Sequence, residues 1–167
     1  GIALIPEDRR GQAIVPVMSV EQNFGMGNYA RFSDHGVLKL KQRKQAIAKH
    51  VADMQIRPAN IHAEIRNLSG GNQQKVVIGK WLATMPKVII LDEPTKGIDI
   101  GSKAAVHGFI SELAAEGLSI IMISSELPEI IGMSDRVLVM KEGLSAGLYD
   151  RDKLSPEALV RAATGNA

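Results

Sequence analysis

The chain has 167 residues, of which 45% are hydrophobic and 23% charged, the proportions of an ordinary globular domain. They exclude collagen-like and wholly disordered chains. The formal net charge of +2 gives no reason to expect nucleic acid as a partner, because a protein that binds the phosphate backbone needs a dense basic surface. The chain has no cysteine, which excludes disulfides and thiolate chemistry, and no apolar run approaches the roughly 18–20 residues that span a bilayer.

The first elements are a strand and a helical stretch. Residues 2–5 are apolar and predict a strand that ends before Pro6, because proline donates no backbone hydrogen bond. A chain that opens with Gly1 inside a strand is expected to be a piece of something longer. Residues 19–67 contain few strand-like runs, and the spacing of apolar residues predicts a helix over Lys39–Arg57.

From Asn67 onward, helices and strands alternate. Helices are predicted at 73–84 and 103–116, after Pro128 and after Ser155; strands are predicted at 88–91, 119–124, 136–140 and 144–149. This alternation indicates an α/β fold with a mainly parallel sheet and helical crossovers. On the helix at 73–84, the spacing of Val77, Trp81 and Met85 predicts a stripe that packs inward.

Two adjacent acids follow the apolar run Val88–Leu91. Asp92 and Glu93 lie where this strand ends, since Pro94 prevents its continuation. Ligands of open parallel sheets sit at the carboxyl ends of the strands, and successive strand residues point to opposite sides. One acid can therefore hold a hydrated Mg²⁺ while the other orients an attacking water, as nucleotide hydrolysis requires. The alternative is that both acids begin a solvent-exposed turn.

A second motif, Asn67–Gln74, precedes this strand. Ser69 is suited to cap a helix, while Gly70 and Gly71 let a ligand approach the backbone. The helix that follows directs free N–H groups and the positive end of its dipole at this place, which suits a phosphate. Taken alone, a serine and two glycines are more often a loop and a cap than a ligand site.

Together, with Gly71 and Asp92 lying 21 positions apart, the two motifs resemble the signature loop and the Walker B strand of ABC-transporter ATPases. The order along the chain matches that family further: Ile5–Glu7 falls at its Q-loop, Gly97–Asp99 at its D-loop and Ser124–Glu126 at its switch-histidine loop. The runs at 72–75, 95–99 and 125–129 are similar to the second nucleotide-binding half of ribose-type monosaccharide importers.

This resemblance implies the site residues. The catalytic residues would be Glu93 and Ser125; the Mg²⁺ ligands would be Asp92 and Glu7; the residues that bind ATP would be Ser69, Gly70, Gly71, Asn72 and Asp99. Three departures stand beside the match. The phosphate-binding Walker A pattern Gly-x-x-x-x-Gly-Lys-[Ser/Thr] is absent, Ser125 replaces the usual histidine, and Glu7 replaces the usual glutamine.

The implied fold is a partial RecA-like P-loop NTPase core with an inserted helical subdomain. Its expected parts are the end of a strand and the Q-loop region (1–18), the helical subdomain with the signature motif (19–80), and the core with Walker B, D-loop and switch loop (81–167). Without a Walker A loop, we expect the isolated chain to be inactive as an ATPase. We also expect it to self-associate through an unpaired sheet edge.

The implied function is ATP-driven monosaccharide import by a peripheral subunit at the cytoplasmic face of the plasma membrane. This half would supply its signature loop in trans to the ATP site of the N-terminal half of the same polypeptide. Its further partners would be the transmembrane permease and, indirectly, a periplasmic sugar-binding protein, with no nucleic acid.

Three alternatives remain open. The first is a fully catalytic half with Glu93 as the base. The second is the head of a chromosome-maintenance or DNA-repair ATPase, which residues 19–67 disfavour because they are too short for a coiled coil and lack heptads. The third is a binding or regulatory module without hydrolysis.

Overall fold

A computed structural model describes residues 1–165 and divides the chain into two compact units, Gly1–Ile123 and a second unit that begins at Ser124. Each unit has its own sheet and helices, and each is described by itself. The predicted subdivision at residues 18 and 80 is finer than this division and stays a prediction. Within residues 1–165, no helix has the length and apolar character needed to cross a bilayer.

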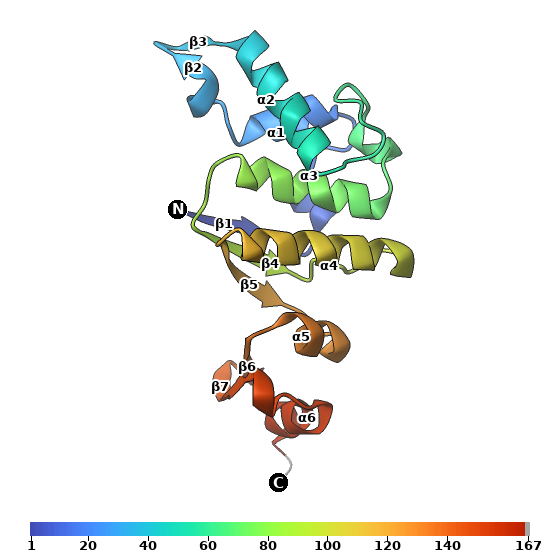
Figure 1. The fold of residues 1–167 in the computed structure, drawn as a ribbon, viewed down its shortest axis with the longest axis vertical. Coiled ribbons are helices and arrows are strands. Elements are labelled where there is room, and N and C mark those ends of the chain that lie inside the picture. The colour runs from blue at the N-terminus through green and yellow to red at the C-terminus, as the bar shows by residue number, and fades with distance from the viewer. Residues whose placement is uncertain (166–167) are drawn as a thin grey trace. The chain divides into compact units, whose positions relative to one another are not determined.

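The first unit is built on a parallel sheet of three strands in the order β1 (Ile2–Ile5), β4 (Val88–Asp92) and β5 (Ser119–Ile123). The register pairs Ile5 with Leu91 and Leu91 with Met122, so the carboxyl ends of the strands meet at one edge. The expected α/β fold with a parallel sheet is confirmed (Figure 1).

The two faces of this sheet differ in burial. Alternation along the strands directs Ala3, Ile5, Ile89 and Leu91 to one face, where all are buried on the side of α3 (Gly70–Leu82). The opposite face carries apolar side chains that remain exposed: Ile2 (73%), Leu4 (53%), Ile121 (53%) and Ile123 (49%). An apolar face of this kind is a candidate contact surface; self-association of the chain stays a prediction.

A helical layer, visible in Figure 1, packs on α3. It contains α1 (Val20–Met26), α2 (Leu40–Asp53), the short hairpin β2 (Ser33–Asp34) and β3 (Val37–Leu38), and single turns η1 (Arg9–Ala13), η2 (Ala30–Phe32) and η3 (Ile65–Asn67). Its centre is Phe24, which is fully buried, and Gly79 of α3 leaves room for that ring: a Cβ on Gly79 would lie 2.6 Å from Phe24 Cζ. The helices therefore approach closely at this glycine.

The stripe expected on α3 is only partly right. Val77 is fully buried and Trp81 is half-buried, but Met85 is 70% exposed. The reason is that α3 ends at Leu82, and Met85 lies in a turn with φ of +53°, where helical spacing no longer decides direction. At its other end α3 begins at Gly70, three residues before the predicted start, because Ser69 caps it.

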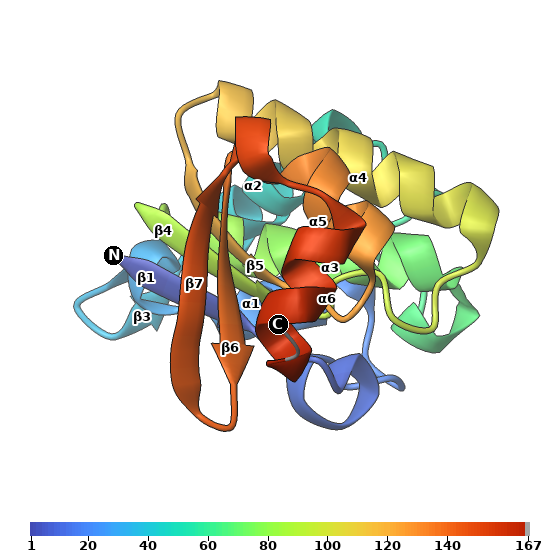
Figure 2. The same ribbon diagram turned by 90° about the horizontal axis from the view of Figure 1, so that it is seen from below.

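The second unit contains α5 (Leu127–Met133), an antiparallel hairpin of β6 (Arg136–Lys141) and β7 (Leu144–Asp150), the turn η4 (Arg151–Lys153) and α6 (Pro156–Thr164). Glu142 and Gly143 form the hairpin turn, both with positive φ, as a tight two-residue connection requires. In Figure 2, α6 lies beside the hairpin, where Leu159 is buried with Val137 and Val139.

Candidate functional site

The carboxyl edge of the first unit's sheet carries the two predicted acids. Asp92 is the last residue of β4, and Glu93 follows it with φ of +47°. The backbone of Glu93 is held on both sides, because its N–H donates to the carbonyl of Ile123 (2.8 Å) and its carbonyl accepts from the N–H of Lys96 (3.1 Å). A non-glycine residue in the left-handed region costs about 1–3 kcal/mol, and such residues occur in tight turns as well as at functional sites. The backbone of Glu93 is therefore strained, and its two hydrogen bonds hold it in this conformation.

Glu7, at the end of β1, is paired with a cation. Its Oε1 lies 2.5 Å from Nζ of Lys96, which follows β4 at the same edge. This bond to Glu7 raises the pKa of Lys96, and the neighbouring charges of Glu93 and Asp92 act in the same direction. Lys96 therefore lies among three acids. Its sequence position, in the turn after Pro94, did not predict these neighbours.

The carboxyl edge of the sheet offers few protein ligands for a Mg²⁺ ion, as is usual where Mg²⁺ binds together with a nucleotide. Among residues 1–165 there is no group of three or more Asp, Glu or His side chains placed to hold a metal. Mg²⁺ bound with nucleotides takes one or two carboxylates, phosphate oxygens and waters. Asp92, partly exposed at the end of β4, supplies one such hard oxygen ligand, so the residues present fit the ion. The metal roles of Asp92 and Glu7 stay predictions.

The signature loop is held by Asn72. The Ser69 hydroxyl oxygen accepts from the Asn72 side-chain amide (3.0 Å) and more weakly from its backbone N–H (3.4 Å), while Asn72 Oδ1 accepts from the N–H of Arg57 (2.9 Å). Within the described 165 residues, no acceptor takes the proton of the exposed Ser69 hydroxyl. That O–H and the first N–H groups of α3 can therefore donate to an anion. Asn72 positions Ser69, and direct contact between Asn72 and a nucleotide stays a prediction.

The two glycines of the loop have different surroundings. A Cβ on Gly70 would meet nothing closer than 3.6 Å, whereas a Cβ on Gly71 would lie 2.9 Å from Cβ of Ser102. Ser102 is in the first turn of α4 (Ile100–Ala115), so Gly71 is required where α3 and α4 touch. Space for a ligand on the Cβ side is therefore a feature of Gly70, while Gly71 is needed for packing against α4. Binding of ATP by the backbone of either glycine stays a prediction.

Asp99 caps α4. Its carboxylate accepts from the N–H of Ser102 at 2.9 Å, and the hydrogen bonds from Ser102 lower the pKa of Asp99. The helix consequently starts at Ile100 rather than at the predicted residue 103. Because Ser102 also touches Gly71, the cap fixes the expected D-loop beside the signature loop. The role of Asp99 in binding ATP stays a prediction.

A small hollow of about 170 Å³ lies between these helix starts. It is lined by Gln55, Arg57, Ser69, Gly71, Asn72, Lys75, Ser102, Ala105 and Val106. The lining includes two cationic side chains and no acid, so its charge suits an anion. Ser125 belongs to the second unit, in the turn before α5; its catalytic role stays a prediction.

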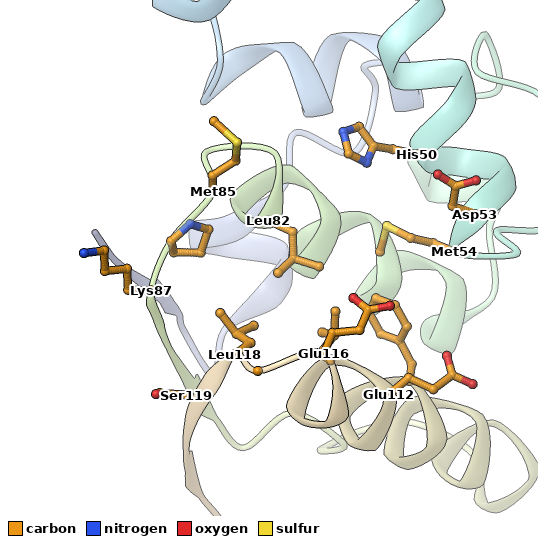
Figure 3. A pocket seen from close by; sticks show the side chains of 14 residues that line it. His50, Asp53, Met54, Leu82, Met85, Lys87, Glu112, Glu116, Leu118 and Ser119 are labelled. Carbon is orange, nitrogen blue, oxygen red and sulfur yellow. The ribbon is translucent and has the colours of Figure 1, made fainter.

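A wider cavity than this hollow, of about 820 Å³, lies at the opposite edge, near the amino ends of β4 and β5. Figure 3 shows side chains from α2, from the loop after α3 and from the end of α4 around it, among them His50, Met85 and Glu112. Burial lowers the pKa of His50. None of the predicted site residues lines this cavity, so size does not identify the site here.

Sequence reasoning missed two cations near the predicted residues. One is Lys96; the other is Arg9, whose guanidinium donates to Gln74 Oε1 in the first turns of α3 (3.4 Å). Both lie in short charged turns, Pro6–Gly11 and Thr95–Asp99, and the only sequence signal for either residue is that it follows a strand closely. The partner of Lys96, Glu7, lies 89 residues away along the chain, and the partner of Arg9, Gln74, lies 65 residues away.

Ligands of open parallel sheets bind at the carboxyl ends of the strands, and phosphates bind at helix N-termini. The acids at the end of β4 and the serine-capped start of α3 offer both features of a nucleotide-binding α/β domain. The family model for ABC transporters matches residues 1–96, more than half of the chain, and the chain belongs to the ABC transporter family.

Curated relatives give a closer likeness. The chain is 68% identical over all 167 residues to ribose import ATP-binding protein RbsA 3 of Rhizobium etli, and 62% identical to RbsA 1 of Agrobacterium fabrum. RbsA 2 of Streptomyces avermitilis is 48% identical to it. In each comparison the whole chain is covered, and it spans 33% of the relative's length.

Solved structures share the fold. The ATP-binding cassette MJ0796, solved as a dimer after hydrolysis with ADP and Pi, superposes with a TM-score of 0.72 at 18% identity, covering 90% of this chain and 62% of that one. An inward-facing metal-chelate type ABC transporter gives a TM-score of 0.83 at 18% identity, covering 98% of this chain and 63% of that one.

Proposed function

We propose that the chain is part of the ATP-binding subunit of a sugar ABC importer and that it presents its signature loop to ATP held by a partner half. The observation that carries this proposal is the Ser69 hydroxyl, which is exposed at the start of α3. Among the described residues its oxygen only accepts hydrogen bonds, so its proton can be donated to a bound phosphate. The names of the relatives, ribose import ATP-binding proteins, support the substrate class.

In this proposal the signature loop and the acids at the end of β4 serve two different ATP sites. Ser69, the Gly70 amide and the α3 N-terminus bind the phosphate edge of the partner's ATP, because N–H and O–H donors and the helix dipole all favour negative charge there. Asp92 would hold Mg²⁺ in this half's own site, and Glu93 would orient water there. The bound ion would polarise the phosphates and neutralise their charge. Ser125 cannot become cationic as a histidine can, so the ATP site that contains Asp92 and Glu93 would bind the phosphates more weakly.

The partners follow from the same proposal. The other ATP-binding half lies in the same polypeptide, of which this chain corresponds to 33% in the relatives. Transmembrane permease subunits carry the sugar, and a periplasmic binding protein delivers it, so the subunit sits peripherally at the cytoplasmic face of the plasma membrane. We propose no role for nucleic acid, in keeping with the small net charge.

One observation favours a second candidate, a fully catalytic half. Glu93 is held in a left-handed conformation by backbone bonds to Ile123 and Lys96. Strain held in place at the carboxyl edge of a parallel sheet is compatible with a catalytic role, so in this candidate Glu93 serves as a working base in its own site. The two candidates differ in which residue the transporter needs most.

The test compares Ser69→Arg with Glu93→Gln in the full-length transporter, with Ser111→Arg on the exposed side of α4 as the control. Charge-assisted hydrogen bonds contribute roughly 1.5–3 kcal/mol each. Loss of two of them lowers hydrolysis by about two to four decades, so Ser69→Arg abolishes most hydrolysis and import while Glu93→Gln and the control cost little. The opposite order, with Glu93→Gln inactive and Ser69→Arg nearly normal, would establish the second candidate instead.

A further inference from the structure

Arg9 lies directly beside the signature loop. It is the first residue of η1, close after β1, and its guanidinium reaches α3: Nη1 donates to Gln74 Oε1 at 3.4 Å, and Nη2 lies 3.6 Å from the point where a Cβ on Gly70 would stand. The carbonyl of Gly97 approaches the same point to 3.7 Å. The side chain therefore sits where the signature loop and the expected D-loop meet.

The positive charge of Arg9 is not compensated. The side chain is half-buried, its Nε is buried without a hydrogen-bond partner, and no carboxylate of residues 1–165 forms an ion pair with it. Burial, and then the charge of Arg10, lower the pKa of Arg9. The positive end of the α3 dipole adds to the same excess.

Proteins normally pair charges that they withdraw from water. Here a guanidinium and a helix N-terminus stand together, and the one long bond to the neutral Gln74 side chain leaves most of the guanidinium donors unused. A guanidinium offers five donors in a planar fork that matches phosphate oxygens. An anion at the Gly70 side of the loop would satisfy these donors and cancel the charge.

We propose that Arg9 is a phosphate-binding residue that acts with Ser69 on the triphosphate presented by the partner half. This inference rests on the proposed function, since it takes the anion to be that nucleotide. It places a cation from the turn after β1 at the signature loop, so that the start of α3, Ser69 and Arg9 bind the same group. The rival role is purely structural, with Arg9 tethering η1 to α3 through Gln74.

The experiment uses the full-length transporter with Mg-ATP and compares Arg9→Met, Arg9→Lys and Arg10→Met, where Arg10 is the exposed neighbour. Charge-assisted bonds of this kind account for about 10- to 100-fold in affinity. Arg9→Met therefore raises KM for ATP by about 10- to 100-fold with a smaller change in kcat, Arg9→Lys recovers part of the loss, and Arg10→Met stays within about threefold of the parent. Thermal unfolding of all three matches the parent.

Three outcomes would overturn the inference. An unchanged KM with a lowered unfolding temperature in Arg9→Met would make Arg9 a tether of α3. An equal rise of KM in Arg9→Met and Arg10→Met would reduce the effect to general surface charge. Ser69→Arg, measured in parallel, distinguishes failure of this inference from failure of the proposed function. If Ser69→Arg is inactive while Arg9→Met is normal, only the inference about Arg9 fails. If Ser69→Arg is active, the proposed function itself fails.

Discussion

Replacement of Gly71 by alanine tests whether the two signature glycines have different duties. The new Cβ would lie 2.9 Å from Cβ of Ser102 and 3.3 Å from its Oγ. Since both Cβ atoms are fixed to helix backbones, neither can rotate away, and α3 and α4 must separate. Overpacking of this kind costs about 1–3 kcal/mol. Gly70→Ala is the matched control, because its Cβ would make only ordinary contacts from 3.6 Å outward.

The difference between these variants is measurable in the 167-residue chain. Any gain from replacing glycine by alanine is at most about 1 kcal/mol and nearly equal at adjacent positions, so it cancels in the comparison. With a urea m-value of about 1–3 kcal/mol/M, we expect the midpoint of Gly71→Ala to lie about 1 M below that of Gly70→Ala. The fluorescence of Trp81, the only tryptophan, and far-UV circular dichroism report the transition.

A second substitution makes the reasoning refutable. Ser102→Gly removes the Cβ that the new methyl group would meet on α4. In the Gly71→Ala background it therefore recovers most of the lost stability, with a coupling energy of about 1 kcal/mol or more. Equal midpoints for Gly70→Ala and Gly71→Ala, or simple additivity with Ser102→Gly, would show that close approach of α3 and α4 is not what requires glycine at residue 71.

Two further predictions concern the helical layer. Asn23 is fully buried, and its amide bonds the N–H of Val15 at 2.8 Å and the carbonyl of Val15 at 3.1 Å. Asn23→Ala therefore lowers the free energy of unfolding by about 2–4 kcal/mol, and a loss below about 0.5 kcal/mol in urea unfolding would contradict this. Burial and then the charge of Arg31 lower the pKa of His50 below 6.5, so the unfolded chain binds this proton more tightly and stability falls as pH drops below about 6.5. His50→Gln should flatten this dependence between about pH 5 and 6.5, whereas an unchanged slope would assign the dependence to other groups.

Local sequence determined the elements that present the candidate site. Val88–Leu91 forms a strand because its β-branched and leucine side chains suit a buried sheet, and Pro94 stops the strand after the two acids. Ser69 caps α3 because its oxygen accepts the N–H of a residue three positions on. Motifs of this kind depend on neighbours within a few residues, so spacing alone predicts them, as it predicted the α/β fold.

Tertiary structure decided which of these residues carry strain, charge or close contact. The left-handed conformation of Glu93 depends on the carbonyl of Ile123, and the choice of glycine at residue 71 depends on Ser102. Lys96 is paired with Glu7 across 89 residues. These interactions are set by how helices and strands dock, because charge pairing and overlap act between atoms close in space, and no periodicity in the chain encodes which distant residue will be the neighbour.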